Sequence, residues 1–174
     1  MKSVRVKIIL TLIFLGQLAG ACSSGPAGNS NSTQNKANQN GLNAASDKVE
    51  ELGMLVVLPM EPEETVFRED QATAAADGSQ PPYSKKLTAV LKYSAADAGK
   101  LSARIEQTSP PLSASINTET WFPAELIAQS DLSGDDTLKG NSFAASDFYQ
   151  APYTEGKITR VEGSNYFILE LFAK

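Results

Sequence analysis

Few side chains in this chain could carry out chemistry, because it contains no histidine and a single cysteine, Cys22. Without histidine, the commonest metal ligand and the commonest general base are both missing. Ser–His triads are therefore excluded, and a lone cysteine cannot build a structural zinc site. Carboxylates remain, and the pairs Glu63/Glu64 and Asp135/Asp136 are candidates for a hydrolase. Neighbouring residues on a strand point to opposite faces, which argues against either pair converging on one substrate.

A second group of oxygen ligands falls in residues 131–141 (DLSGDDTLKGN), which we expect to form a loop. Its candidate calcium ligands are Asp131, Ser133, Asp135 and Asp136. The EF-hand loop has glycine at its sixth position and glutamate at its twelfth, where this stretch has Asp136 and Ser142. We therefore expect an ordinary turn, and the sequence predicts neither a metal ion nor a cofactor.

The surroundings of Cys22 indicate a different chemistry, that of export and anchoring. The first seven residues are basic, residues 8–15 are almost wholly aliphatic, and small residues at 19–21 precede the cysteine. These three parts in this order are typical of an export signal. Residues 8–21 are too few for a membrane-spanning helix, which needs about 20 apolar residues. An ordinary secretory signal, cleaved after Ala21, would leave Cys22 as a free thiol.

With the cysteine directly after the small residues, the segment resembles the lipobox of bacterial lipoproteins. The resemblance implies cleavage between Ala21 and Cys22, diacylglycerol on the Cys22 thiol and acylation of the new amino terminus. Two acyl chains already give stable attachment to a bilayer, and this cysteine would carry three. Ser23 and Ser24 lack the aspartate that in this family accompanies inner-membrane retention. The resemblance thus implies a lipid-anchored protein of the cell envelope, in the outer membrane rather than the inner one, facing the periplasm or the cell surface.

The chain is expected to have three parts. Residues 1–21 are the cleaved signal peptide. Residues 22–47 are the lipidated cysteine and a tether rich in Ser, Asn and Gly, which cannot bury enough apolar area to offset its chain entropy. A random chain of this length reaches roughly 25–30 Å. Residues 48–174 are long enough for a single globular domain with one core.

Periodicity in residues 48–174 predicts both helices and strands. Ser94 followed by Asp97 is a capping-box signature, and apolar residues at helical spacing predict a helix at about 95–107. Pro123 favours a short helix at about 123–129. Strands are predicted at 52–58, 87–93, 112–122, 157–162 and 166–172, the last two joined by a type II′ turn at Gly163–Ser164. Together these predict an α+β domain with a mainly antiparallel sheet of about five or six strands.

Two features of this domain are expected to be structural rather than functional. The acidic stretch 60–82 is interpreted as an exposed loop with a brief strand at Val66 and Phe67. The run YFILELF at 166–172 is nearly continuous apolar and is expected to be a central strand covered on both faces. The remaining aromatic residues are expected to lie in the core: Trp121, Phe122, Phe143, Phe148, Tyr149 and Tyr153.

The net charge of the chain limits the classes of molecule that it is expected to bind. Without residues 1–21 it has 12 basic and 20 acidic residues, a net charge near −8. This charge repels phosphate backbones and anionic headgroups, so we expect no nucleic-acid partner and membrane attachment through the lipid on Cys22 alone. The sequence favours a non-catalytic binding or interaction module, not an enzyme, whose partner is an envelope protein, cell-wall material or a small ligand. A structural surface or spacer protein is the alternative, and a carboxylate-dependent hydrolase is less favoured.

Overall fold

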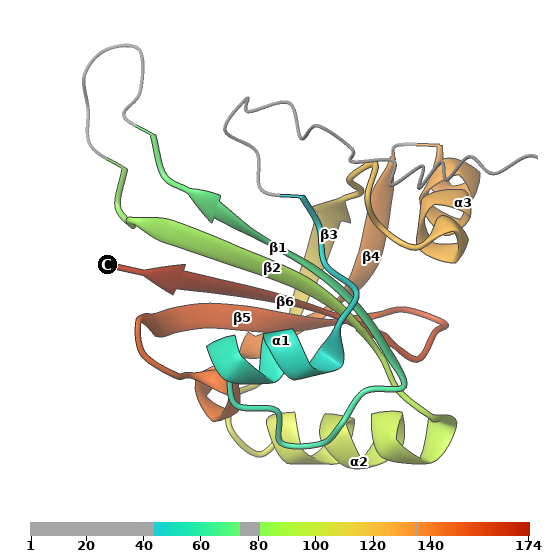
Figure 1. Ribbon diagram of the computed structural model, residues 1–174. Coiled ribbons are helices and arrows are strands. Elements are labelled where there is room, and N and C mark those ends of the chain that lie inside the picture. The colour runs from blue at the N-terminus through green and yellow to red at the C-terminus, as the bar shows by residue number, and fades with distance from the viewer. Residues whose placement is uncertain (1–43, 74–80, 135) are drawn as a thin grey trace, which may run out of the picture. The chain divides into compact units, whose positions relative to one another are not determined.

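The computed structural model describes residues 44–73, 81–134 and 136–174. These residues form one six-stranded antiparallel sheet in the order β1-β2-β6-β5-β4-β3, with three α-helices, which confirms the predicted α+β class (Figure 1). The strands are β1 (Glu64–Gln71), β2 (Lys85–Lys92), β3 (Leu112–Asn117), β4 (Thr137–Ala144), β5 (Tyr153–Val161) and β6 (Tyr166–Ala173). The helices are α1 (Val49–Leu55), α2 (Ala95–Ile105) and α3 (Ala124–Ser133), with a single 3-10 turn at Ser146–Phe148. None of the helices in the described ranges has the length and apolar character needed to span a bilayer.

The sheet carries a core on each of its two faces. Leu169 and Leu171 of β6 belong to the core that contains residues of α1 and α2, and we call this side the α2 face. Ile168, directly before Leu169, belongs to the core that contains Phe122, beside α3, and Leu126, within it, and we call this side the α3 face. Because residues of β6 belong to both cores, this strand is covered on both faces, as its sequence predicts.

Helix α2 confirms the strongest helix prediction. The Ser94 hydroxyl accepts a hydrogen bond from the Asp97 backbone N–H at 3.1 Å, which satisfies one of the free donors of the first turn. Ala98, Leu101 and Ile105 are fully buried and lie on one side of the helix. The helix ends at Ile105, two residues before the predicted boundary.

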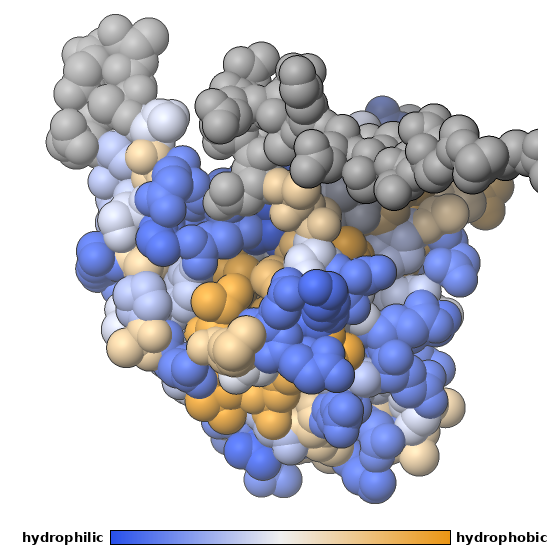
Figure 2. Space-filling model, viewed as in Figure 1, coloured by the Kyte–Doolittle hydropathy of each residue, from blue (hydrophilic) through white to orange (hydrophobic). Residues whose placement is uncertain are grey.

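Residues 52–58 do not form the predicted strand. They begin inside helix α1, and residues 56–58 follow it without regular structure. Leu52 and Val56 are four residues apart and fully buried, whereas Met54 and Val57 are 69% and 45% exposed. Within α1 itself, Leu52 is buried and Met54 is exposed, and an apolar run of this length does not show by itself whether it forms a helix or a strand. Figure 2 shows the apolar surface that remains beside α1.

The acidic stretch 60–82 contains a full edge strand rather than a loop with a brief strand. Strand β1 pairs with β2 along its whole length. Its charged side chains are held by lysines of β2, with Glu64 bonded to Lys92 at 3.0 Å and Glu69 to Lys85 at 2.7 Å. Ser46 forms two backbone hydrogen bonds with Phe67 on the outer edge of β1. Charges are typical of edge strands, so acidity was a poor signal for a loop.

The second half of the chain differs from prediction in its boundaries. Helix α3 follows Pro123 as predicted but continues to Ser133, where Gly134 ends it with a φ of 77°. Strand β3 ends at Asn117, so residues 118–122 are not part of it. Residues 131–141 are not a single loop, because they include the last turn of α3 and the first half of β4.

The predicted C-terminal hairpin is present, but its turn is longer than expected. Strand β5 begins at Tyr153, four residues before the predicted start, and pairs with β6 with one register shift between Tyr153 and Glu155. The connection is the four-residue loop 162–165, in which Gly163 has a φ of 70°. The two-residue type II′ turn predicted at Gly163–Ser164 is therefore wrong.

Thr88 of β2 is a buried polar residue on the α3 face. It is 3% exposed, and its hydroxyl makes no hydrogen bond within the described part of the chain. An unpaired buried hydroxyl costs about 1–3 kcal/mol. We therefore expect the nearly isosteric variant Thr88→Val to stabilise the protein by about 1 kcal/mol in urea unfolding followed by circular dichroism.

Thr159 provides a matched control for this substitution. It is 1% exposed, and its hydroxyl donates to the Ser142 hydroxyl at 3.2 Å. Thr159→Val removes that hydrogen bond and is expected to destabilise the protein. If Thr88→Val lost as much stability as Thr159→Val, the Thr88 hydroxyl would have a partner after all.

Candidate functional site

The residue with the clearest predicted chemistry, Cys22, lies outside the described residues, as does the tether up to residue 43. Asp135 lies outside them as well. The lipid anchor therefore stays a prediction of the sequence, and the candidate site has to be built from the folded residues.

The candidate calcium ligands are divided between two elements. Asp131 and Ser133 lie in the last turns of α3, and Asp136 follows the glycine that ends that helix. Across the described ranges, no three His, Cys, Asp or Glu side chains lie close enough together to hold a metal ion. The structure thus does not bring the described members of this set together.

The candidate carboxylate pair Glu63/Glu64 lies at the start of β1, and both side chains are exposed. Glu64 is bonded to Lys92 of the neighbouring strand at 3.0 Å. The other pair cannot be placed, because Asp135 is not described.

Most of the candidate aromatic residues lie in the core, as predicted. Phe122, Phe143, Phe148 and Tyr153 are between 0% and 5% exposed. Tyr149 is half-buried against the same core. Trp121 is half-buried too, and its indole N–H donates to Glu119 at 2.8 Å while Arg68 lies 5.3 Å from its ring. Arg68 also bonds Glu119 at 2.7 Å, so this cluster connects β1 to the segment after β3.

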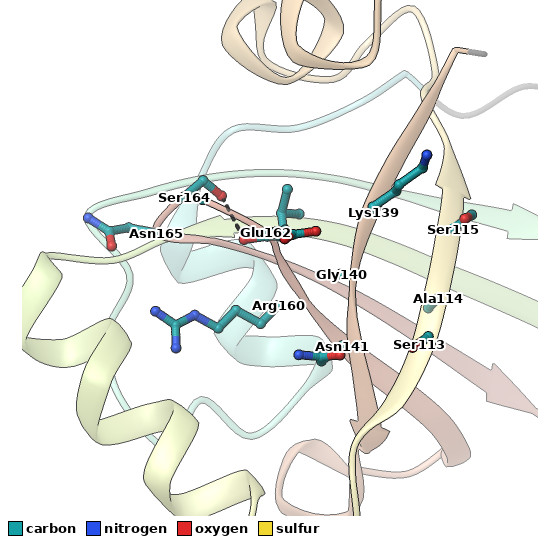
Figure 3. Close-up of a pocket in the computed structure, with 12 residues that line it drawn as sticks. Ser113, Ala114, Ser115, Lys139, Gly140, Asn141, Arg160, Glu162, Ser164 and Asn165 are labelled. Carbon is teal, nitrogen blue, oxygen red and sulfur yellow. Dashed lines mark hydrogen bonds between the residues drawn. The ribbon is translucent and has the colours of Figure 1, made fainter. Parts of the chain in front are cut away.

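A polar hollow of about 680 Å³ lies over β3, β4 and the end of β5 (Figure 3). It is lined by Ser113, Ala114, Ser115, Lys139, Gly140, Asn141, Arg160, Val161, Glu162, Gly163, Ser164 and Asn165. The three strands contribute neighbouring rows of side chains, and the loop 162–165 forms one wall. Most of the lining side chains are polar, in contrast to the two cores.

Strand register explains why these side chains meet. Arg160 of β5 is opposite Asn141 of β4, which is opposite Ser113 of β3. Residues directly opposite one another in neighbouring strands share a face of the sheet. Arg160 also has the same parity as Ile158, which lies in the core of the α2 face. The row Ser113–Asn141–Arg160 therefore lies on the α2 face, as a polar continuation of that core's surface.

Arg160 is the unusual member of this row. Its side chain is half-buried, and it makes no hydrogen bond or ion pair with any described residue. The two other described arginines are both ion-paired, Arg68 with Asp70 and Glu119, and Arg104 with Asp147. Figure 3 shows the Arg160 side chain extending from β5 with Asn165 and Asn141 on either side of it. Its guanidinium is thus a free donor directed into the hollow.

The loop that forms the wall of the hollow is fixed by hydrogen bonds. The Glu162 N–H donates to the Lys139 carbonyl at 2.9 Å, and Gln129 of α3 donates to the Glu162 carbonyl at 2.9 Å. The Ser164 hydroxyl donates to the Val161 carbonyl at 3.1 Å. A wall held in this way loses little conformational freedom when a ligand binds.

The backbone of β4 lies close to the backbone of Arg160. A Cβ atom on Gly140 would lie 2.1 Å from the Arg160 carbonyl oxygen, so only glycine fits at this point of β4. The close approach holds the backbone of Arg160 in place and leaves its long side chain as the movable part of the site.

The hollow can donate hydrogen bonds around one unpaired positive charge. A guanidinium carries five N–H donors, and the side chains of Asn141 and Asn165 add amide donors and acceptors. Glu162 contributes a carboxyl group to the same lining. These groups suit the binding of a polar ligand with an anionic group.

The sequence-based search did not single out any of these residues. Asn141 fell in the predicted loop 131–141, and the partnership of β3, β4 and β5 depends on a register that one sequence does not reveal. One signal was available in β5: Arg160 has the same parity as the apolar Ile158 in the strand predicted at 157–162. A charge at a core-facing position is informative because it is costly unless it is paired.

The geometry of this hollow has to be interpreted from the chain's own residues. Comparison with family models, with curated proteins and with solved structures found no match in any of the three.

Proposed function

We propose that the protein is a non-catalytic binding module of the bacterial cell envelope, anchored by lipid on Cys22, with its ligand site in the hollow over β3–β5. The observation that carries the binding function is the free Arg160 guanidinium in a concave, polar and hydrogen-bonded surface. The anchor is supported by the pattern of residues 1–22, with an outer-membrane location favoured by Ser23 and Ser24.

The hollow favours binding over the alternative of a structural spacer. A spacer needs only a stable outer surface, and the described domain ion-pairs Arg68 and Arg104 in the way such a surface would. An unpaired arginine beside a concavity adds nothing to a spacer and costs stability. Proteins tolerate such local costs where a ligand later offsets them.

Site-specific photo-crosslinking of the full chain in its native envelope tests this proposal. A photoreactive phenylalanine analogue in place of Asn141, which is exposed and lines the hollow, is expected to give a discrete adduct identifiable by mass spectrometry. The same analogue in place of Ala103, exposed on the outer side of α2, is the matched control and is expected to give no such adduct.

A third arm of the experiment tests the anchor. In Cys22→Ser cells the protein is expected to leave the membrane fraction, and the adduct from position 141 is expected to weaken or disappear if the partner belongs to the envelope. Identical adduct patterns from positions 141 and 103, or none from position 141, would contradict the binding site. Membrane association that survives Cys22→Ser would contradict the anchor.

A further inference from the structure

We propose that the hollow binds a carboxylate and that the Arg160 guanidinium is the group that pairs with it. This inference rests on the proposed function, because it names the ligand class of the same site.

The first argument is the cost of leaving Arg160 unpaired. Arginine keeps its positive charge at every physiological pH, and withdrawing that charge from water costs free energy that an opposite charge must offset. The chain has 20 acidic residues against 15 basic ones, so a carboxylate partner would be easy to supply from within. None of the described carboxylates takes this role. A ligand anion supplies the missing partner.

The second argument is that Arg68 and Arg160 each have a carboxylate two residues further along the chain, but only Arg68 pairs with it. Arg68 and Asp70 are two residues apart on β1, and Arg68 Nε lies 2.9 Å from Asp70 Oδ1. Arg160 and Glu162 have the same spacing at the end of β5, yet they form no ion pair, and both residues are described. Figure 3 shows the guanidinium extending away from Glu162. Arg160, which lines the hollow, is therefore directed away from Glu162, the carboxylate that is nearest to it in sequence (Figure 3).

The third argument distinguishes a carboxylate from phosphate. A guanidinium binds both with two parallel hydrogen bonds. The lining of the hollow, however, has two cationic side chains, Lys139 and Arg160, together with the Glu162 carboxylate, and without residues 1–21 the chain has 12 basic and 20 acidic residues. The Glu162 carboxylate repels a phosphate, which carries close to two negative charges at neutral pH, more strongly than it repels a singly charged carboxylate. With two cationic side chains and one carboxylate, the lining carries one net positive charge, which matches the single negative charge of a carboxylate.

The other polar residues of the lining determine which groups of the ligand, next to its carboxylate, the hollow can bind. The amides of Asn141 and Asn165 and the hydroxyl of Ser113 can bond to amide or hydroxyl groups beside it. Two sources in a cell envelope have this chemistry, the free carboxyl end of a peptide and the carboxyl group of a sugar acid. Both present one carboxylate next to hydrogen-bonding groups.

NMR titration of the native lipidated protein in detergent micelles tests the inference. The probes are N-acetyl-alanyl-alanine, its C-terminal amide, glucuronate, glucose and inorganic phosphate. At least one carboxylate probe is expected to shift the Nε–Hε resonance of Arg160 and the amides of residues 139–141 and 160–165, and the tighter of the two identifies the source. The amide and glucose are expected to leave these resonances unchanged, and phosphate to bind several-fold more weakly.

Substitutions separate the pairing from a general charge effect. Arg160→Gln is expected to weaken carboxylate binding at least tenfold, about the value of one charge-assisted hydrogen bond. Arg160→Lys keeps the charge but loses the planar guanidinium, so its carboxylate affinity is expected to lie between those of the wild type and Arg160→Gln. Arg104→Gln removes the same charge from α2, where the side chain is 55% exposed, and is expected to leave the affinity unchanged.

Four results would overturn the inference: no binding of either carboxylate, equal affinity in Arg160→Gln and the wild type, equal losses in Arg160→Gln and Arg104→Gln, or phosphate binding as tight as the better carboxylate. If any of these results occurred while the crosslinking experiment still gave an adduct from position 141, the proposed binding site would be supported. Only the assignment of a carboxylate as its ligand would be rejected. Failure of both experiments would reject the site itself.

Discussion

Replacing Gly156 with alanine is expected to lower the free energy of unfolding by about 2–4 kcal/mol. Gly156 lies within β5, opposite Leu171 of β6. A Cβ atom there would be 2.2 Å from the Glu170 carbonyl oxygen and 2.6 Å from Leu171 Cδ2. Its φ of 156° is also one that residues with side chains rarely adopt. The methyl group fits only if the pairing of β5 with the central strand β6 shifts, and both cores depend on that pairing.

Gly99 is the control for this experiment, because the same substitution there should act in the opposite direction. It lies inside α2, is exposed, and an added Cβ would meet no atom within 4 Å. Alanine in a helix interior is more stable than glycine by roughly 0.5–1 kcal/mol. Urea unfolding of Gly156→Ala and Gly99→Ala should therefore give changes of opposite sign. A Gly156→Ala protein as stable as the wild type would mean that β5 and β6 are not in close contact at this point.

The elements that were predicted well are those whose sequence signals are local. Helix α2 has its cap residue, Ser94, three positions before Asp97, and its apolar residues repeat at helical spacing. Strand β6 is a nearly continuous apolar run, which is typical of a strand covered on both faces. In both elements the pattern within the segment and its environment in the fold agree.

The elements that were mispredicted owe their structure to distant partners. Strand β1 is stable despite its charges because Lys85 and Lys92 of β2 bind Glu69 and Glu64. Helix α1 forms because Leu52 and Val56 can reach the core of the α2 face, which the seven-residue run alone does not reveal. Such pairings between separate segments cannot be deduced from one sequence.

The candidate site was hidden for the same reason. Its central row joins Ser113, Asn141 and Arg160 from three strands, and only the register places them side by side. The sequence could indicate at most that Arg160 occupies a core-facing parity in β5. Arg68 is paired and Arg160 is not. This difference depends on the directions of the two side chains, which follow from the fold.

Replacing Glu170 with glutamine is the second substitution for which we expect a large loss of stability. Glu170 lies on the α3 face of β6, and its side chain is only 12% exposed. Its two oxygens each bind one ammonium group, that of Lys86 at 2.8 Å and that of Lys157 at 3.0 Å. Glutamine has nearly the same shape but no charge, so it loses both charge-assisted hydrogen bonds. At pH 7 the expected loss is about 1–3 kcal/mol in the free energy of unfolding.

The loss should depend on pH with a defined sign. Burial acts to raise the pKa of Glu170, but the hydrogen bonds from Lys86 and Lys157 outweigh it and hold that pKa below its ordinary value of 4.5. A carboxyl group whose pKa is lowered by folding binds protons more weakly in the folded than in the unfolded state. Its contribution is therefore complete above the unfolded pKa and disappears as the pH falls through the folded pKa. The wild type and Glu170→Gln should differ at pH 7 and converge in acid.

Urea unfolding at pH 7 and at successive values below 4.5 measures this convergence, and Glu64→Gln controls for surface charge. Glu64 forms an ion pair of similar length with Lys92, but its side chain is 63% exposed. Exposed pairs of this kind contribute little, because water and salt screen them. We therefore expect no measurable change from Glu64→Gln at either pH. A difference between the wild type and Glu170→Gln that stayed constant into strong acid would show that the substitution acts through packing, and that the two lysines do not stabilise the charge on Glu170.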